Sequence, residues 1–127
     1  MSIPSYKRLT IALGIVCVLM LVLCGCLFWN HGWLTIRVAW ATEQINIFDE
    51  MRQRALQSDA ADAAGCLAYV VSYYPSGSKQ KTNSRLDRMV ERDRVRVTRD
   101  ILAYLRIKTG QDLGEHPEVW IQKYGTR

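Results

Sequence analysis

Residues 9–29 read LTIALGIVCVLMLVLCGCLFW, an apolar run of 21 residues without a charged side chain. As an α-helix rising about 1.5 Å per residue, the run is about 31 Å long, close to the roughly 30 Å hydrocarbon core of a bilayer. A single segment in lipid can satisfy all of its backbone hydrogen-bonding groups only as a helix. We therefore expect an all-α protein with one transmembrane helix at residues 9–29.

Three interpretations of this run remain open: an uncleaved signal anchor, a cleaved secretory signal and a bacterial lipoprotein signal. A cleaved signal has a shorter apolar stretch followed by small residues, whereas this run ends in the bulky residues 27–29. Residues 23–26, LCGC, resemble the bacterial lipobox, in which glycine precedes the cysteine that is acylated, here Cys26. Cysteine is unusual at the second lipobox position, and residues 27–29 are unlike the polar linker that normally follows. The sequence favours the anchor.

The flanks of the run predict its orientation. Lys7 and Arg8 precede it, and the uncharged residues 30–33 (NHGW) follow it. By the positive-inside rule, residues 1–8 lie in the cytoplasm and the C-terminal part lies on the periplasmic or other extracytoplasmic side. We expect residues 30–33 to form an interfacial hinge where the membrane helix ends. The alternative is a nearly continuous helix, because no glycine or proline interrupts residues 34–57.

Residues 34–127 suffice for one small helical domain, because several of their stretches repeat apolar residues at helical spacing. The stretch 76–83, SGSKQKTN, has no large apolar residue and predicts an exposed loop. The expected helices cover residues 34–57, 59–74 and 85–108, with a short fourth helix that begins at Pro117. This pattern predicts a small three-helix bundle with a short C-terminal helix.

Residues typical of helix ends delimit these segments. Ser58 and Ser84 are the expected N-caps of the second and third helices. Pro75 ends the second helix, because proline cannot continue the hydrogen-bond ladder, and Gly110 ends the third. We expect Trp120 to pack the last helix against the bundle.

The third helix carries the most distinctive charge pattern of the chain. The protein has a net charge of +5, and residues 79–108 alone contain ten Lys or Arg against four Asp or Glu. On a helical projection, the apolar residues Leu86, Val90, Val97, Ile101 and Leu105 form one stripe. The opposite side is formed by five arginines: Arg85, Arg88, Arg92, Arg96 and Arg99.

These five arginines are the candidate binding residues of the sequence. Guanidinium groups bind phosphates and carboxylates, so the predicted partner is an acidic protein or an anionic lipid surface, in addition to the bilayer itself. Nucleic acid is disfavoured, because the domain is expected outside the cytoplasm and no aromatic residues alternate with the arginines to stack on bases. The sequence does not indicate an oligomeric state.

Residues 109–120 carry a short motif. Thr109, Gly110, the triplet 112–114, Pro117 and Trp120 resemble the T-G-x-D-[F/L]-G-x-x-P-x-x-W ending of some bacterial HEAT-type repeat and related small helical proteins. This resemblance implies a structural role: a helix stop, a turn and a tryptophan that holds the last helix. His116 departs from the capping Asp or Asn frequent before the proline. The resemblance implies no functional residue, and no segment recurs at the 35–45-residue period of such repeats.

The sequence contains none of the common catalytic or nucleotide-binding motifs, and we expect no cofactor and no metal. The single cysteine of the domain, Cys66, is expected to be a buried apolar residue. We therefore expect a non-enzymatic, membrane-anchored interaction or structural module. One alternative is a lipoprotein acylated at Cys26, and another is a small enzyme that uses a pocket joining Asp112, His116 and Tyr124.

Overall fold

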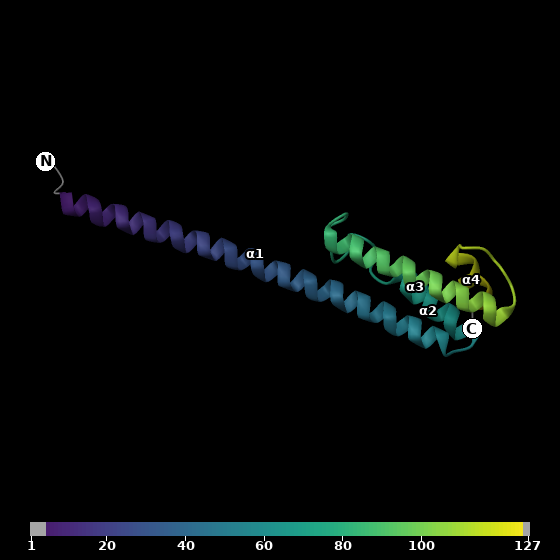
Figure 1. Ribbon diagram of the computed structural model, residues 1–127. Coiled ribbons are helices and arrows are strands. Elements are labelled where there is room, and N and C mark those ends of the chain that lie inside the picture. Colours follow the sequence, from purple (N-terminus) through teal and green to yellow (C-terminus); the bar gives the residue numbers. More distant parts are fainter. Residues whose placement is uncertain (1–4, 126–127) are drawn as a thin grey trace. The chain divides into compact units, whose positions relative to one another are not determined.

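The computed structural model describes residues 5–125, and these residues contain four α-helices and no strand, which confirms the all-α class (Figure 1). The chain divides into two compact units, one ending at Ile36 and one beginning at Arg37. Residues 1–4 of the predicted cytoplasmic segment lie outside the described residues. The helices are α1 (Ser5–Leu56), α2 (Ala60–Ser72), α3 (Arg85–Thr109) and α4 (Pro117–Tyr124).

The first unit is helical and apolar. Residues 6–36, all within α1, have exposed side chains, including all of their Leu, Ile and Val residues. The most apolar window of α1 has a mean hydropathy of 3.0, and none of it is buried within the protein. By length and composition, this helix could cross a membrane. An apolar surface of this size is expected to be covered by lipid or by another protein rather than by water.

The structure shows no break in α1 at residues 30–33, where the sequence predicted a hinge. A glycine such as Gly32 costs a helix only about 1 kcal/mol relative to alanine, which neighbouring helical turns offset. The Oγ1 atom of Thr35 donates to the carbonyl oxygen of His31 at 3.0 Å, and the rings of Trp29 and Trp33 pack edge to face at 6.5 Å. The helix therefore continues through this stretch.

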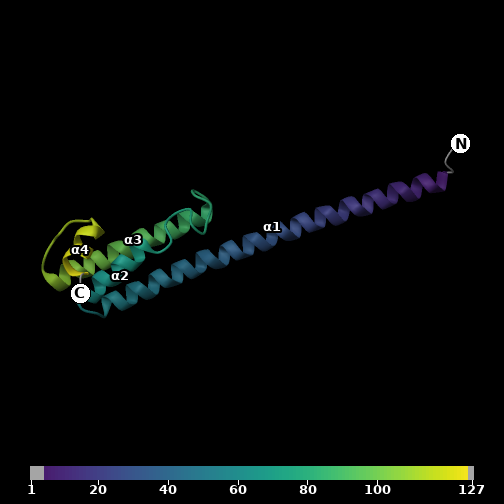
Figure 2. The ribbon, with the colours of Figure 1, turned by 180° about the vertical axis from the view of Figure 1, so that it is seen from behind.

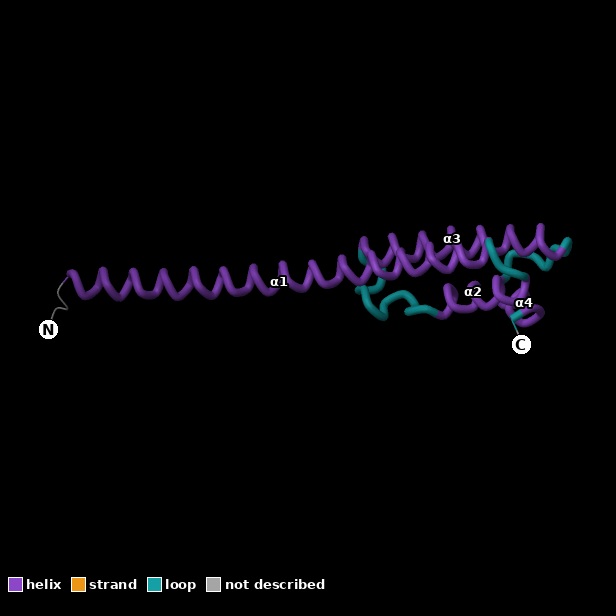
Figure 3. The backbone as a smooth tube through the Cα atoms, turned by 90° about the horizontal axis from the view of Figure 1, so that it is seen from below, coloured by secondary structure: helices purple, strands orange, loops and turns teal. Residues whose placement is uncertain are grey.

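The second unit contains the hydrophobic core. The later turns of α1, together with α2 and α3, run side by side, and α4 packs on α2 (Figures 1 and 2). Viewed from below, α2 and α4 lie together on one side of α3 (Figure 3). The largest side chains with no exposed surface come from all four helices: Phe48, Leu67, Val70, Val97, Ile101, Leu105 and Trp120. Burial of these side chains is the main favourable contribution to the fold of this unit.

The ends of α3 are as predicted. The Oγ atom of Ser84 accepts a hydrogen bond from the backbone N–H of Asp87 at 3.2 Å. At the other end, Gly110 adopts a left-handed conformation with φ of 68°, which glycine tolerates without steric cost. The predicted apolar stripe is also confirmed, since Val90 and Val97 are almost completely buried.

The start and end of α2 differ from the prediction. The N-cap is Asp59 rather than Ser58: the Asp59 carboxylate accepts from the backbone N–H of Asp62 at 2.9 Å, whereas the Ser58 hydroxyl donates to the carbonyl of Ala55. A carboxylate at the positive end of the helix dipole is favoured. The helix ends at Ser72, two residues earlier than predicted, because Tyr74 precedes a proline, and that position disfavours the helical conformation.

Candidate functional site

The five candidate arginines lie on one exposed side of α3. We call Arg85, Arg88, Arg92, Arg96 and Arg99 the arginine face; all five side chains are exposed. They project away from Val90 and Val97, whose side chains pack in the core. The structure thus brings the predicted residues together on a single helix surface, as their spacing required.

The arginines differ in how they are paired. Among residues 5–125, the side chains of Arg85, Arg92 and Arg99 make no hydrogen bond and no ion pair. Arg88 donates from Nη1 to the carbonyl oxygen of Asn83 at 2.7 Å. Arg96 lies 2.7 Å from the carboxylate of Asp93, and the hydrogen bond and charge of that carboxylate raise the pKa of Arg96. The repulsion between successive arginines is therefore partly offset, and three guanidinium groups keep their full capacity to bind an anion.

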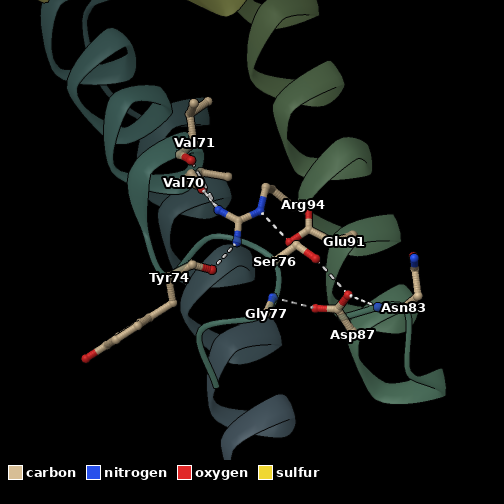
Figure 4. Close-up of polar contacts among 9 residues, drawn as sticks. All are labelled: Val70, Val71, Tyr74, Ser76, Gly77, Asn83, Asp87, Glu91 and Arg94. Atoms are coloured by element: carbon tan, nitrogen blue, oxygen red, sulfur yellow. Dashed lines mark hydrogen bonds and ion pairs between the residues drawn. The ribbon is translucent and has the colours of Figure 1, made fainter. Parts of the chain in front are cut away.

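Another arginine of this helix, Arg94, was not predicted from the sequence to have a special role, and the structure places it in a different environment. Its side chain is only 8% exposed and points into the space between α2 and α3 (Figure 4). It donates to the carbonyl oxygens of Val70 and Tyr74, both at 2.6 Å, and its Nε lies 3.2 Å from the carboxylate of Glu91. Its guanidinium carbon also lies 4.9 Å from the centre of the Phe48 ring. Arg94 thus satisfies backbone carbonyls at the end of α2, where helical partners are missing.

A buried carboxylate of α3, Asp87, holds the loop that connects α2 to α3. It is 5% exposed and accepts hydrogen bonds from Ser76 Oγ at 2.7 Å, from the Asn83 N–H at 2.9 Å and from the Gly77 N–H at 3.2 Å (Figure 4). Burial alone would raise the pKa of Asp87, but these three bonds and the charge of Arg94 outweigh it, so the pKa lies below its usual range.

A signal for these two residues is present in the sequence. Positions 87 and 94 lie seven residues apart, three before Val90 and three before Val97, so a helical projection places them at the edge of the apolar stripe. A charged residue within such a stripe is expected to be paired, because an unpaired buried charge is very costly. The hydrogen-bond partners of Asp87 and Arg94 lie largely in residues 73–84, which have no helical or strand pattern. The packing of this loop against α3 was therefore not predicted.

Three cavities adjoin the arginine face, and one of them, of about 420 Å³, is lined by Met89 and by Arg85, Arg88 and Arg92 of the face itself. A second, of about 300 Å³, is lined by apolar groups of Val71, Val95 and Leu102, with Arg99 and Arg106 among its other lining residues. The third, of about 280 Å³, is lined by Ile45 of α1 and Met89 of α3, together with Asp93 and two arginines of the face, Arg92 and Arg96. A ligand on this face would therefore meet apolar surface beside the guanidinium groups.

The cysteines are all free. Cys17, Cys24 and the candidate lipidation residue Cys26 are exposed on α1, within its apolar part. Cys66 is buried in α2, and burial raises the pKa of its thiol. Among residues 5–125, no group of three His, Cys, Asp or Glu side chains is placed to hold a metal ion.

The three residues of the enzyme alternative, Asp112, His116 and Tyr124, share no hydrogen-bond partner among the described residues. The Asp112 carboxylate accepts from the Gly114 N–H and from Arg106 Nε, both at 3.0 Å, and these hydrogen bonds lower its pKa. The Tyr124 hydroxyl donates to the Gln111 side chain at 2.9 Å. His116 is exposed, and it makes no side-chain hydrogen bond at the start of α4.

The motif at residues 109–120 forms a compact turn. The indole Nε1 of Trp120 donates to the carbonyl oxygen of Gly114 at 2.9 Å, and the Trp120 side chain has no exposed surface. Gly110 and Gly114 both have positive φ angles, 68° and 85°.

Comparison with known proteins identifies no relative: no protein-family model matches the chain, and neither a curated protein nor a solved structure is significantly similar to it.

Proposed function

We propose that this protein is a non-enzymatic, membrane-anchored interaction module. Its apolar N-terminal helix acts as an uncleaved signal anchor, and the unit from Arg37 onward is displayed on the non-cytoplasmic side. That unit is a three-helix bundle, built from the later turns of α1 with α2 and α3, and closed by α4 through Trp120. Support comes from the long exposed apolar helix and from a core that draws on all four helices.

The arginine face is the proposed binding surface, and the proposed partner is an acidic protein. The observation that carries this proposal is the contrast along α3. Arg94 is buried and donates from all three guanidinium nitrogens, whereas the side chains of Arg85, Arg92 and Arg99 are exposed and unpaired among the described residues. Unpaired guanidinium groups beside apolar cavities suit an acidic surface with apolar side chains, because guanidinium binds carboxylate in a planar, two-bond geometry.

Charge reversal of the unpaired arginines tests this proposal. The full chain in detergent is titrated with poly-L-glutamate, and the triple variant Arg85→Glu, Arg92→Glu and Arg99→Glu is compared with wild type. We expect the variant to bind at least about tenfold more weakly, because the electrostatic attraction becomes repulsion. The matched control reverses three basic residues elsewhere: Arg54, Lys108 and Lys123. Equal binding by wild type and the arginine variant, with helicity unchanged, would contradict the proposal.

The lipoprotein alternative differs from the anchor in that an acyl group would be covalently attached to Cys26. Acylation would need Cys26 to become the first residue of the chain, and Cys26→Ala would then abolish processing. An anchored helix would be unaffected by that substitution. The enzyme alternative would require Asp112, His116 and Tyr124 to act on one ligand, although Asp112 and Tyr124 are bonded to different partners.

A further inference from the structure

The loop of residues 75–84 packs against the first turns of the second unit. The buried side chain of Gln80, 4% exposed, donates from Nε2 to the carbonyl oxygen of Arg37 at 2.8 Å. The ammonium group of Lys79 lies 4.1 Å from the centre of the Tyr74 ring and 5.8 Å from the centre of the Trp40 ring. The loop is therefore held beside residues 37–40 of α1, at the end of the unit where it begins.

This loop is fixed in place although it has no regular structure. Two residues of α3 hold it: Asp87 accepts hydrogen bonds from the loop, and Arg94 donates to the carbonyl oxygen of Tyr74 just before it (Figure 4). Gly77 has a φ of 85°, a conformation that glycine adopts readily. The charges on the loop are thus presented in a defined arrangement, which lowers the entropy cost of binding a ligand.

The end of the unit formed by this loop is strongly basic. We call Arg37, Lys79 and Lys81 the basic end. The one acidic residue between positions 72 and 90 is Asp87, and its carboxylate is buried and bonded to the loop itself. Arg37 and Lys81 are exposed, and their side chains have no hydrogen bond or ion pair among residues 5–125. These positive charges are therefore available to an external anion.

The chain connects this basic end directly to the apolar helix. Arg37 is the first Lys, Arg, Asp or Glu after Arg8, so the 28 residues from Leu9 to Ile36 carry no such charge. As a helix they are about 42 Å long, close to the roughly 40–45 Å of a bilayer that includes both headgroup regions. If Arg8 lies at one headgroup region, chain length alone places Arg37 at the other.

We infer that the basic end binds the phosphate groups of anionic lipids in the bilayer that α1 enters. The inference rests on the proposed membrane anchor, and it concerns charges distinct from the five arginines of the arginine face. Lysine and arginine residues near a membrane surface each contribute about 1 kcal/mol of attraction to anionic lipid. Trp40 and Tyr74, the aromatic neighbours of Lys79, are residue types enriched at membrane interfaces. Lipid rather than an acidic protein is the partner, because Arg37 is covalently held next to the apolar span.

The test uses the full chain reconstituted in vesicles of phosphatidylcholine with or without 30% phosphatidylglycerol. The association of spin-labelled phosphatidylglycerol and spin-labelled phosphatidylcholine with the protein is compared. We expect the wild type to prefer phosphatidylglycerol, and Arg37→Gln with Lys81→Gln to reduce that preference at least about fivefold. The matched control, Arg54→Gln with Lys108→Gln, removes two charges far along α1 and α3 and should keep it.

The outcomes separate this inference from the anchor on which it rests. A wild type without preference, or a variant that keeps the full preference of wild type, would overturn the lipid-binding inference while the chain remains in the vesicles. A chain that fails to remain in pure phosphatidylcholine vesicles would overturn the anchor, and with it the basis of the inference. Loss of the preference in the control pair as well would show that net charge, not the basic end, is responsible, and would also overturn the inference.

Discussion

The guanidinium group of Arg94 donates a hydrogen bond of 2.6 Å to the carbonyl oxygen of Tyr74, across the space between α3 and the end of α2. Tyr74 has a positive φ of 39° and directly precedes Pro75, so its carbonyl belongs to a chain that has left the helix. Together with the bond to Val70, this contact closes the end of α2. It makes a buried charge part of the structural framework of the domain rather than part of its binding surface.

Replacement of Arg94 should be strongly destabilising. Arg94→Met leaves the carbonyls of Val70 and Tyr74 without their partner, and we expect it to lower the free energy of unfolding by about 2–4 kcal/mol. Arg92→Met, on the exposed side of the same helix, should change it by less than about 0.5 kcal/mol. Urea unfolding of the full chain in detergent, followed by far-ultraviolet circular dichroism, measures both. Equal stabilities of the two variants would contradict the structural role of Arg94.

The stability of the loop should depend on pH through Asp87. Because the folded-state pKa of Asp87 is lowered, its carboxylate stabilises the fold above the unfolded-state pKa of about 3.9. That stabilisation is lost as the pH falls through the folded-state pKa. Asp87→Asn should therefore make the free energy of unfolding fall less steeply in acid, and Ser76→Ala should do so in part. The same acid slope in wild type and Asp87→Asn would exclude this residue as the cause.

The indole of Trp120 should be needed for the docking of α4. Trp120→Phe keeps an aromatic ring but loses the hydrogen bond to Gly114, with an expected cost of about 1–2 kcal/mol. Trp120→Ala also leaves a cavity and should cost about 3–5 kcal/mol. Amide hydrogen exchange over residues 111–124 would show whether α4 opens before the rest of the unit. Unchanged exchange in the alanine variant would mean that α4 does not depend on this side chain.

The thiol of Cys66 should react only when the domain opens. Burial keeps thiol reagents away from Cys66 and raises the pKa of its thiol, so little thiolate is present in the folded domain. In a chain with Cys17, Cys24 and Cys26 replaced by serine, Ellman's reagent should react with Cys66 at a rate that rises with denaturant. Ser72→Cys, on an exposed position of the same helix, provides the fast reference. A Cys66 as fast as that reference in the native state would show that the site is open.

Local sequence signals predicted much of the secondary structure. Ser84 and Gly110 mark the ends of α3 because caps and left-handed glycines act within a few residues of the backbone that they satisfy. Ser58 was predicted as the N-cap of α2, but Asp59 occupies that position. Serine and aspartate are both favourable N-caps, so residue preference alone does not distinguish two neighbouring candidates. The break expected near Gly32 was wrong for a related reason: one glycine is a small cost within a long helix.

The arrangement of charges was only partly predictable. The spacing of the arginine face follows from helical periodicity, and the structure confirms that its five members share one exposed surface. The burial of Arg94 and Asp87, and the packing of Lys79 and Gln80 against residues 37–40 of α1, depend on the path of a loop without periodicity. That path is set by long-range bonds, such as Gln80 to Arg37, which link residues 43 positions apart. No local pattern encodes such a contact.

The membrane anchor is the central claim, and the intact mass of the membrane-extracted protein tests it most directly. The protein is expressed in a bacterial host, membranes are washed with salt and carbonate, and the mass is measured after detergent extraction. We expect the full chain with residues 1–29 retained, released by detergent alone. A chain that begins at Cys26 and carries added acyl groups would contradict the anchor in favour of a lipoprotein. A chain without the apolar run, released by the wash, would contradict membrane attachment altogether.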